Sequence, residues 1–515
     1  MFDSSLPEVA AFAALDDTGV VDAIRQLTQA ENALCARKLA AMAELFGRRT
    51  GCADAAERDM WWVDPDAAVA AEIGAAGGIS QGLALSQTHR GVALRDRLPA
   101  VARLFAAGLV SDLVVRTIVW RTALITSPGA MARLDCDLAK RVTRWGALSQ
   151  KKTEQAVDEL VDRIDPGALR HPRSSSSQRD AQFGSPGDEP GFMTMWARVY
   201  ATDGVVIQQR VEEIARSVCE ADPRSADERR ADALAPAITH TDFVCQCGQP
   251  DCAQAERAEP PSKTAVVYVV ADEKSVDTAG TPPAARESEP IEPAAAPSQL
   301  APSEPAPPSA RPAFVFGAGV LPNALLEGIL ERARIREVRH PGGDSPPEPR
   351  YIPSLSMADF VRCRDLTCRF PGCDKPAQFC DLDHTVPYPV GPTHPSNLKC
   401  LCRFHHLLKT FWNGATGWRD RQLPDGTVEW TSPTGHTYTT YPGSKHLFPT
   451  LCEPTATLWA GKPPTVESTA DRDVMMPKRR HTRAHNKAKA ITAERKLNDA
   501  YAADRIAERN KPPPF

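Results

Sequence analysis

Side chains that bind metals or transfer protons are concentrated in one short stretch, residues 368–409. The stretch reads C-R-F-P-G-C-D-K-P-A-Q-F-C-D-L-D-H-T-V-P and, after a short connection, N-L-K-C-L-C-R-F-H-H-L-L-K. It combines cysteine pairs, two aspartates, an asparagine and two adjacent histidines, a density that no other part of the 515-residue chain reaches. Thiolate, imidazole and carboxylate groups together favour metal binding coupled to proton transfer.

Four of these residues have the types and spacing of a structural zinc site. Cys368 and Cys373 flank the turn at 371–372, Pro-Gly, which can bring two thiolates together. Cys402 and His405 are three residues apart at the start of an expected helix and so share a face. Three thiolates and an imidazole complete a tetrahedral zinc site, and a region with so few large apolar residues needs a metal to fold. The spacing also leaves two alternative ligands, Cys380 and Cys400.

Between the cysteine pairs, the tetrapeptide D-L-D-H at 381–384 is expected to form a strand. Alternation along a strand places Asp381 and Asp383 on one face and His384 on the other. A helix is expected to begin near Cys402 and to carry His406. The elements that must position the chemistry are therefore a strand, a loop and a helix.

Hydrolysis of a phosphodiester requires a base for water, a divalent cation near the phosphate and groups that orient both. His384 can be the base, since neutral imidazole is available at pH 7. Asp383 and His406 can bind one cation and leave positions for water and phosphate oxygens. Asn397 can orient the loop or His384, or bind the cation itself.

In this order the residues resemble the HNH endonuclease family. That family has a ββα-metal fold, with Asp-His on a hairpin, Asn in a loop and the last His on a helix. Asp383-His384, Asn397 and His406 match this pattern, as do Pro387 and the loop G-P-T-H-P-S-N-L. The resemblance implies cleavage of DNA with Mg²⁺ or Mn²⁺. It assigns His384 as general base, Asp383 and His406 as cation ligands, and Asn397 as the orienting residue.

One departure affects the metal assignments. The family's second zinc pair is usually C-x2-C-H, whereas this chain has Cys402-R-F-His405-His406. The zinc site is of the Cys₃His type if His405 replaces a cysteine. The catalytic cation instead loses a ligand if His406 binds zinc. An alternative function is a zinc-stabilised DNA-binding or mobile-element accessory protein whose HNH module no longer cuts.

A second cysteine cluster lies in the middle of the chain, at C-Q-C-G-Q-P-D-C. Cys245, Cys247 and Cys252 surround a Gly-Pro-containing turn and could hold a second zinc, with His240 as a possible fourth ligand. The spacing departs from a C-x2-C knuckle, so reduced thiols in a surface loop are the alternative.

The net charge of −4 does not attract DNA, so DNA binding depends on local groups of basic residues. Arg403 and Lys409 are expected to contact phosphate, and Arg369 and Lys399 add positive charge beside them. The segment from Lys478, K-R-R-H-T-R-A-H-N-K-A-K, is basic and poor in apolar residues. It is expected to be a disordered tail or marginal helix that binds DNA nonspecifically.

The remaining sequence predicts an α+β multidomain protein with a mainly helical N-terminal part. Helical periodicity covers 17–46 and 80–125, with a helix end at Gly108 and helix starts at Ser111 and Ser149. The string R-R-A-D-A-L after D-P-R resembles a helical domain of unknown function fused to HNH nucleases in actinobacteria and their phages. The predicted parts are a helical domain with a few strands (15–272), a flexible Pro/Ala/Glu/Ser-rich linker (273–313), a short ordered segment (314–340), a small zinc-stabilised HNH domain (350–445) and a basic tail (465–515).

Composition limits the class of protein. Hydrophobic residues make up 42% and charged residues 24%, values typical of globular proteins. Neither a run of eighteen apolar residues nor a signal peptide is evident. We therefore expect a cytoplasmic protein with DNA as its partner and no membrane, in which the 14 cysteines are thiols or metal ligands.

Overall fold

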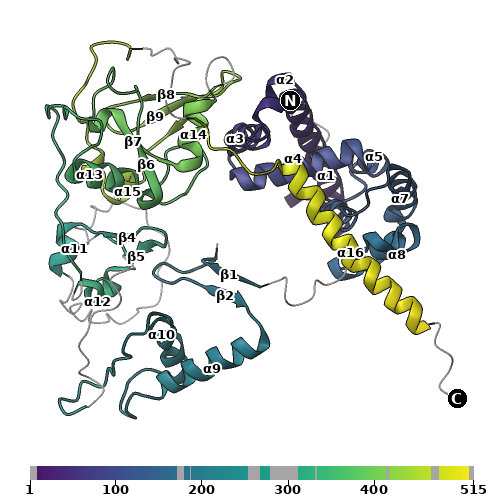
Figure 1. Cartoon of the computed structure of the whole chain (residues 1–515), viewed down its shortest axis with the longest axis horizontal. Coiled ribbons are helices and arrows are strands. Elements are labelled where there is room, and N and C mark those ends of the chain that lie inside the picture. Colours follow the sequence, from purple (N-terminus) through teal and green to yellow (C-terminus); the bar gives the residue numbers. More distant parts are fainter. Residues whose placement is uncertain are drawn as a thin grey trace. The chain divides into compact units, whose positions relative to one another are not determined.

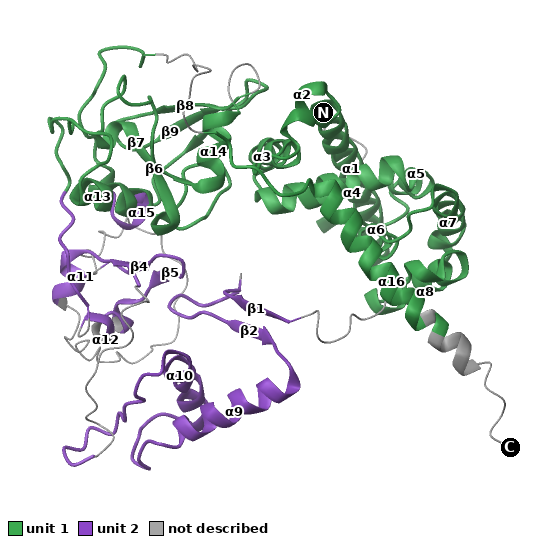
Figure 2. Ribbon diagram, viewed as in Figure 1, with its two compact units in different colours: residues 1–172, 340–443, 450–515 green, residues 173–339, 444–449 purple. Residues whose placement is uncertain are grey.

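The computed structural model describes residues 8–170, 179–185, 187–252, 267–278, 311–330, 333–412, 417–464 and 475–509. Its fold is mixed α/β, with a helical N-terminal region and several small sheets, as expected for the class (Figure 1). The contacts divide the chain into two compact units (Figure 2). The first comprises Met1–Pro172, His340–Gly443 and Thr450–Phe515, and the second Arg173–Arg339 and Ser444–Pro449. Most of the expected linker, 279–310, lies outside the described residues.

The N-terminal part of the first unit is built from helices around one apolar core that includes Leu39, Phe105 and Leu134. Ser111 and Ser149 accept backbone N–H groups and start α6 and α8, as predicted. The helices are α1 (Asp17–Thr50), α2 (Ala53–Arg58), α3 (Pro65–Gly77), α4 (Gln81–Asp96), α5 (Pro99–Ala106), α6 (Asp112–Arg121), α7 (Pro128–Arg141) and α8 (Gln150–Ile164).

Gly108 follows α5 with φ of 75°, a conformation that favours glycine. A Cβ at this position would lie 2.2 Å from the carbonyl oxygen of Gln29. The predicted helix end is therefore confirmed, and it also allows α1 to approach the turn closely.

Of the two expectations for the basic tail, disorder is wrong for residues 483–509 and a helix is confirmed, since they form α16 (Arg483–Arg509). Ile491 packs against the N-terminal helical core. Arg495 Nη1 lies 2.9 Å from Asp165 Oδ2, and Asn498 Nδ2 donates to the carbonyl oxygen of Gly167 at 3.1 Å. The sequence of α16 does not reveal these partners, because they lie more than 300 residues earlier in the chain.

The C-terminal part of the first unit contains a hairpin followed by a helix. Strand β6 (Cys380–His384) pairs antiparallel with β7 (Leu398–Cys402), so that Asp383 lies opposite Lys399. The other elements are α13 (Leu355–Asp365), α14 (Arg403–Phe411), β8 (Arg419–Gln422), β9 (Val428–Thr431) and β10 (Thr437–Thr440), the last three forming a sheet of order β10-β9-β8. Gly426, with φ of 80°, lies in the turn between β8 and β9. Trp430 is fully buried and donates to Arg369 O at 2.9 Å, which ties this sheet to the segment before the hairpin.

The second unit contains small sheets and short helices. Ser225 is the N-cap of helix α10 and forms a capping box with Glu228. Helix α9 begins at Ala201, after the N-cap Tyr200. The elements are β1 (Asp180–Phe183), β2 (Met195–Arg198), α9 (Ala201–Ala215), α10 (Ala226–Thr239), β3 (Val269–Val270), α11 (Glu273–Thr278), β4 (Ala313–Val315), β5 (Gly319–Leu321), α12 (Glu327–Leu330) and α15 (Ser444–Leu447).

Among the described residues, no single helix has the length and apolar character needed to cross a membrane. The pair α3 and α4 meets that criterion only when the two are taken together, and it is bent by 105° at the break.

Candidate active site and metal centres

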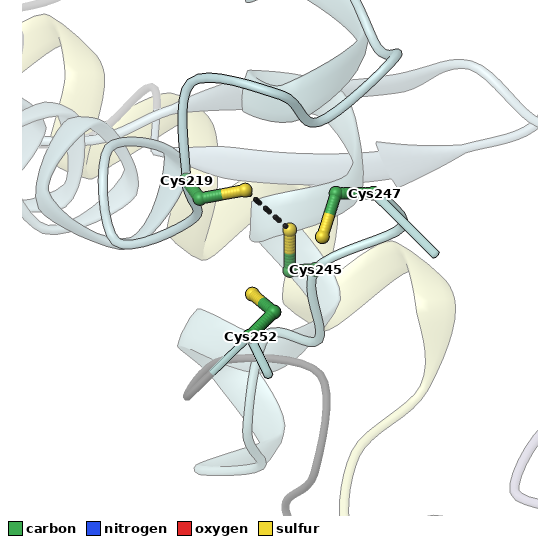
Figure 3. A group of neighbouring side chains, drawn as sticks. All are labelled: Cys219, Cys245, Cys247 and Cys252. Carbon is green, nitrogen blue, oxygen red and sulfur yellow. Dashed lines mark hydrogen bonds between the residues drawn. The ribbon is translucent and has the colours of Figure 1, made fainter. Parts of the chain in front are cut away.

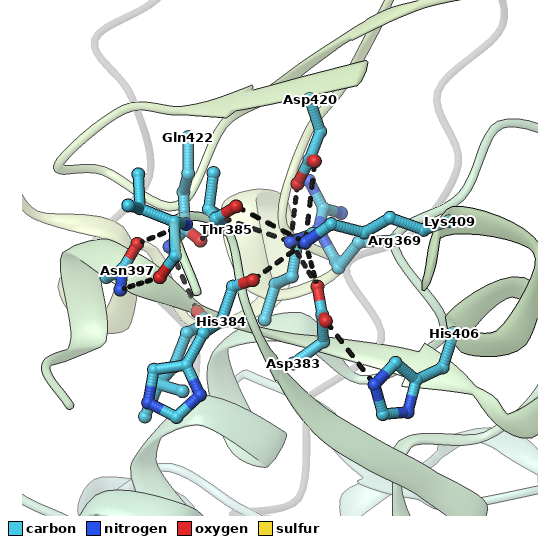
Figure 4. A network of polar contacts seen from close by, with 12 residues as sticks. Arg369, Asp383, His384, Thr385, Asn397, His406, Lys409, Asp420 and Gln422 are labelled. Carbon is cyan, nitrogen blue, oxygen red and sulfur yellow. Dashed lines mark hydrogen bonds and ion pairs between the residues drawn. The ribbon is translucent and has the colours of Figure 1, made fainter. Parts of the chain in front are cut away.

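The hairpin and the helix after it bring three of the predicted polar residues together. Two of them, Asp383 and His406, are seen facing each other in Figure 4. His406, in the first turns of α14, lies with Nδ1 2.8 Å from Asp381 Oδ2 and with Nε2 3.5 Å from Asp383 Oδ1. Both aspartates therefore share the face of β6 that α14 covers, as strand alternation predicted.

Asp383 divides its two oxygens between different partners. Lys399 Nζ and Lys409 Nζ donate to Oδ2 at 2.7 and 2.6 Å, whereas Oδ1 faces His406. Asp420 on β8 lies 2.6 Å from the ammonium of Lys399. Burial raises the pKa of Asp383, but the two ammonium groups outweigh burial and hold that pKa below its ordinary value. Asp383 is consequently an anion with one oxygen available towards His406.

His384 lies against a different group of residues. Its ring stacks on Tyr351 with centroids 5.3 Å apart, and its Nε2 is 2.9 Å from Thr393 Oγ1. The Thr393 hydroxyl donates its single proton to the carbonyl oxygen of Tyr351 at 3.3 Å. When this hydroxyl donates to Tyr351 O, Thr393 Oγ1 accepts from His384 Nε2–H, and the lone pair of the imidazole is on Nδ1.

The protonation state of His384 suits a base. Burial lowers the pKa of His384 to about 4, and the ammonium groups of Lys399 and Lys409 act in the same direction against the attraction of Asp383. The imidazole is therefore neutral at pH 7. Its orientation is set by buried Thr393 and by the exposed ring of Tyr351.

Asn397 holds the loop between the two strands. Its Oδ1 accepts from Val386 N at 2.8 Å, and its Nδ2 donates to Val386 O and Pro392 O at 3.0 and 2.9 Å. A Cβ on Gly391 would lie 2.1 Å from Val386 O, so only glycine fits there. Of the roles considered for Asn397, orientation of the loop is the one that these contacts match.

The basic residues near the site mostly point inward. Lys399 is fully buried, and Lys409 uses its ammonium on Asp383 and on the carbonyl oxygen of His384 at 2.7 Å. Arg369 is buried and donates to Thr440 O at 2.7 Å. The expected phosphate contact of Lys409 is incompatible with these bonds. Arg403, whose side chain is 57% exposed, lies with Nη1 3.3 Å from Asp381 Oδ2, and its expected phosphate contact stays a prediction.

The first cysteine cluster forms as its spacing indicated. The ligand atoms of Cys368, Cys373, Cys402 and His405 all lie within 4.8 Å of one another. Nδ1 of His405 is 3.5 Å from Cys368 Sγ and 3.3 Å from Cys402 Sγ. Zn–S bonds of about 2.3 Å in a tetrahedron separate the ligand atoms by about 3.8 Å, so this set, in which all but the half-buried Cys373 are buried, fits zinc.

The alternative ligands lie outside this set. Cys380 Sγ is 3.4 Å from the carbonyl oxygen of Pro376, and Cys400 Sγ is 3.9 Å from that of Val361. The ring of His405 stacks on Phe370 with centroids 3.9 Å apart, which fixes its orientation towards the sulfurs. The two consecutive histidines therefore face different groups, since His405 faces the thiols and His406 faces the aspartates.

The second cluster gains a member that the sequence did not indicate. Cys245, Cys247 and Cys252 come together with Cys219, and their sulfur atoms all lie within 4.8 Å of one another. His240, the fourth ligand considered, instead ends α10 with φ of 55° and is not in this group. Cys219 precedes the other three by at least 26 residues, so no local spacing marked it.

Asp420 is the other residue that sequence reasoning missed. It lies on β8, beyond the motif, and contacts both lysines that hold Asp383. Only its carboxylate type could have indicated a role, and that signal is shared by many surface residues.

The fold and sites thus define a mixed α/β protein with two cysteine-rich groups able to bind a metal such as zinc. The chain matches the family described as "Domain of unknown function (DUF222)" over residues 27–365, a span that ends before Cys368. It is 48% identical over 525 residues to the uncharacterized protein Rv2100 of Mycobacterium tuberculosis (strain ATCC 25618 / H37Rv), covering 100% of this chain and 93% of the relative. It is 45% identical over 523 residues to the uncharacterized protein Rv3776 of the same strain, covering 100% and 95%. The chain belongs to the DUF222 family; no solved structure matches it.

Proposed function

We propose that this protein is a metal-dependent DNA endonuclease of the HNH type. The observation that carries the proposal is the relation of Asp383 to His406. An anionic oxygen on a strand and an imidazole nitrogen on the next helix face each other at 3.5 Å. His384, neutral and with its lone pair on Nδ1, extends from the same strand. A cation site next to a base is the minimum that hydrolysis of a phosphodiester needs.

The roles follow from these contacts. Asp383 Oδ1 and His406 Nε2 would hold Mg²⁺ or Mn²⁺, which when bound offsets negative charge on the phosphate. His384 Nδ1 takes the proton of the attacking water, while Thr393 Oγ1 retains Nε2–H. Asn397 keeps the loop in place, and exposed Arg403 contacts the DNA backbone. A zinc ion bound by Cys368, Cys373, Cys402 and His405 would stabilise the scaffold.

One observation favours the second candidate, a DNA-binding accessory protein with a silent HNH module. Two ammonium groups already neutralise Asp383, and their charge repels a divalent cation. His384 is also only 7% exposed. The enzyme therefore requires that DNA reach His384 Nδ1, and that the cation bind Asp383 through Oδ1 and not Oδ2, together with His406 Nε2.

Nicking of supercoiled plasmid in Mg²⁺ or Mn²⁺ tests the proposal. The purified wild type should nick, and His384→Ala should lose about 100-fold or more, the usual contribution of a general base. His89→Ala, which changes an exposed histidine on α4, is the matched control and should nick normally. Equal rates for His384→Ala and wild type would rule out His384 as the base. If the wild type and both variants bind DNA but none of them nicks it, the silent module is favoured.

A further inference from the structure

We propose that Cys219, Cys245, Cys247 and Cys252 bind one zinc ion that stabilises the second unit, whether or not the protein cuts DNA. The four side chains converge, and their sulfur atoms lie within 4.8 Å of one another (Figure 3). Cys219 Sγ and Cys245 Sγ are 3.5 Å apart. That separation is far from the about 2.05 Å of a disulfide. It is close to the about 3.8 Å expected between thiolates on tetrahedral zinc.

The fold brings the four thiols from two separate segments. Cys219 follows α9, and the other three follow α10, which packs against α9. Gly248, with φ of 66°, turns the chain between Cys247 and Cys252. A metal at this point would join the end of one helix to the loop that leaves the other.

Asp222 fixes the loop that carries the ligands. Its Oδ2 accepts from the backbone N–H of Gln246 at 2.9 Å, directly between Cys245 and Cys247. Arg224 Nη2 donates to the same Oδ2 at 2.8 Å and to Val244 O at 2.9 Å. The Asp222 side chain is fully buried. Buried groups that orient a ligand loop without joining it are typical of metal sites.

The local core explains why a metal is needed. Among the described residues, the apolar cluster beneath the thiols consists of few side chains, and one of them is a proposed ligand. Its buried members are Val211, Ile214, Ala215, Val218, Ala233, Phe243 and Cys245. A core of this size rarely holds a fold by itself, and small domains compensate with disulfides or metals. Four thiolates select a soft or borderline ion, and zinc needs no redox partner.

Metal analysis of the purified full-length chain tests the site. We expect two zinc ions per chain in the wild type, and one in Cys219→Ser. Cys136→Ser, which changes an exposed cysteine on α7, and His240→Ala should both keep two. An equal zinc content in Cys219→Ser and wild type would overturn the proposal, as would iron in place of zinc. One zinc in the wild type and none in Cys219→Ser would support this site and count against the zinc of the proposed nuclease.

Cobalt substitution covers the case in which Cys219→Ser does not fold. Cys402→Ser removes a ligand of the other cluster only. Cobalt bound to this variant should show the thiolate charge-transfer bands of a sulfur-only tetrahedral site. Bands of a mixed sulfur and nitrogen site, or no binding, would contradict a Cys₄ site in the second unit.

Discussion

Thr393 Oγ1 lies 2.9 Å from His384 Nε2 and donates a hydrogen bond to the carbonyl oxygen of Tyr351. With the hydroxyl donating to Tyr351 O, the imidazole carries its proton on Nε2. The same ring is held on its face by Tyr351. The proposed base therefore depends on Thr393, a residue of the loop between β6 and β7 to which the sequence assigned no role, and substitutions at Thr393 test that dependence.

Thr393→Val should lower nicking about 10-fold to 100-fold, because the isosteric side chain cannot accept Nε2–H and the ring loses its fixed tautomer. Thr393→Ser keeps the hydroxyl and should stay near the wild-type rate. Plasmid nicking across pH distinguishes the two, since a positioning residue alters the pH profile as well as the rate. An unchanged profile for Thr393→Val would remove Thr393 from the mechanism.

Asn397→Ala should destabilise the first unit by about 2–4 kcal/mol, because three buried backbone groups of the loop lose their partner. Urea unfolding followed by tryptophan fluorescence measures this change, since Trp418 and Trp430 are buried in the same unit. Asn486→Ala, at an exposed position on α16, is the control and should change stability little. A loss below about 0.5 kcal/mol would mean that the loop does not depend on Asn397.

His394 should make stability depend on pH. Burial lowers the pKa of His394, whose Nδ1 accepts from Ser396 N at 3.0 Å and whose Nε2 lies 3.1 Å from Ser345 Oγ. A lowered folded-state pKa means that the contribution is full above the unfolded pKa of about 6.5 and is lost as the pH falls towards the folded pKa. The melting temperature of the wild type should exceed that of His394→Asn at pH 7.5, with a smaller difference at pH 5.5. A constant difference would show that His394 does not titrate differently on folding.

Asn498→Ala should loosen α16 from the N-terminal helices. The Asn498 amide is buried and donates to the carbonyl oxygens of Gly167 and Leu169 at 3.1 and 2.6 Å, so its removal leaves two acceptors without a partner. We expect faster hydrogen exchange and faster proteolysis in 483–509. Lys487→Ala, an exposed change on the same helix, should leave both rates as in the wild type.

The exposed charges before and in the first turns of α16 should carry nonspecific DNA binding. Replacing Lys478, Arg480, Lys487 and Lys489 with glutamine leaves the docking residues intact. The slope of log affinity against log salt should become shallower by up to about 3–4, since each phosphate contact contributes about 0.9. Filter binding to a random duplex at several salt concentrations measures the slope. The same slope in both proteins would place the contacts elsewhere.

Local chemistry was readable from the sequence because it depends on neighbours along the chain. The helix starts at Ser111 and Ser149 follow from side chains that cap the next turn. The shared face of Asp381 and Asp383 follows from strand alternation. The grouping of Cys368 with its three partners also follows from local structure. Cys373 lies across a turn from Cys368, Cys402 ends β7, and His405 lies in the first turn of α14.

Only tertiary structure decided which distant groups meet. Whether Lys409 faces DNA or Asp383 depends on where α14 lies on β6, and Asp420 reaches both lysines from a strand outside the motif. Cys219 joins its cluster because α9 packs on α10. Helix α16 is held by contacts with residues that lie over 300 positions earlier, a separation that no local pattern reveals. The sequence by itself determined the residue types and the local elements that can bind metals and move protons. The packing of those elements decided which side chains share a site, because such contacts depend on separation in space rather than along the chain.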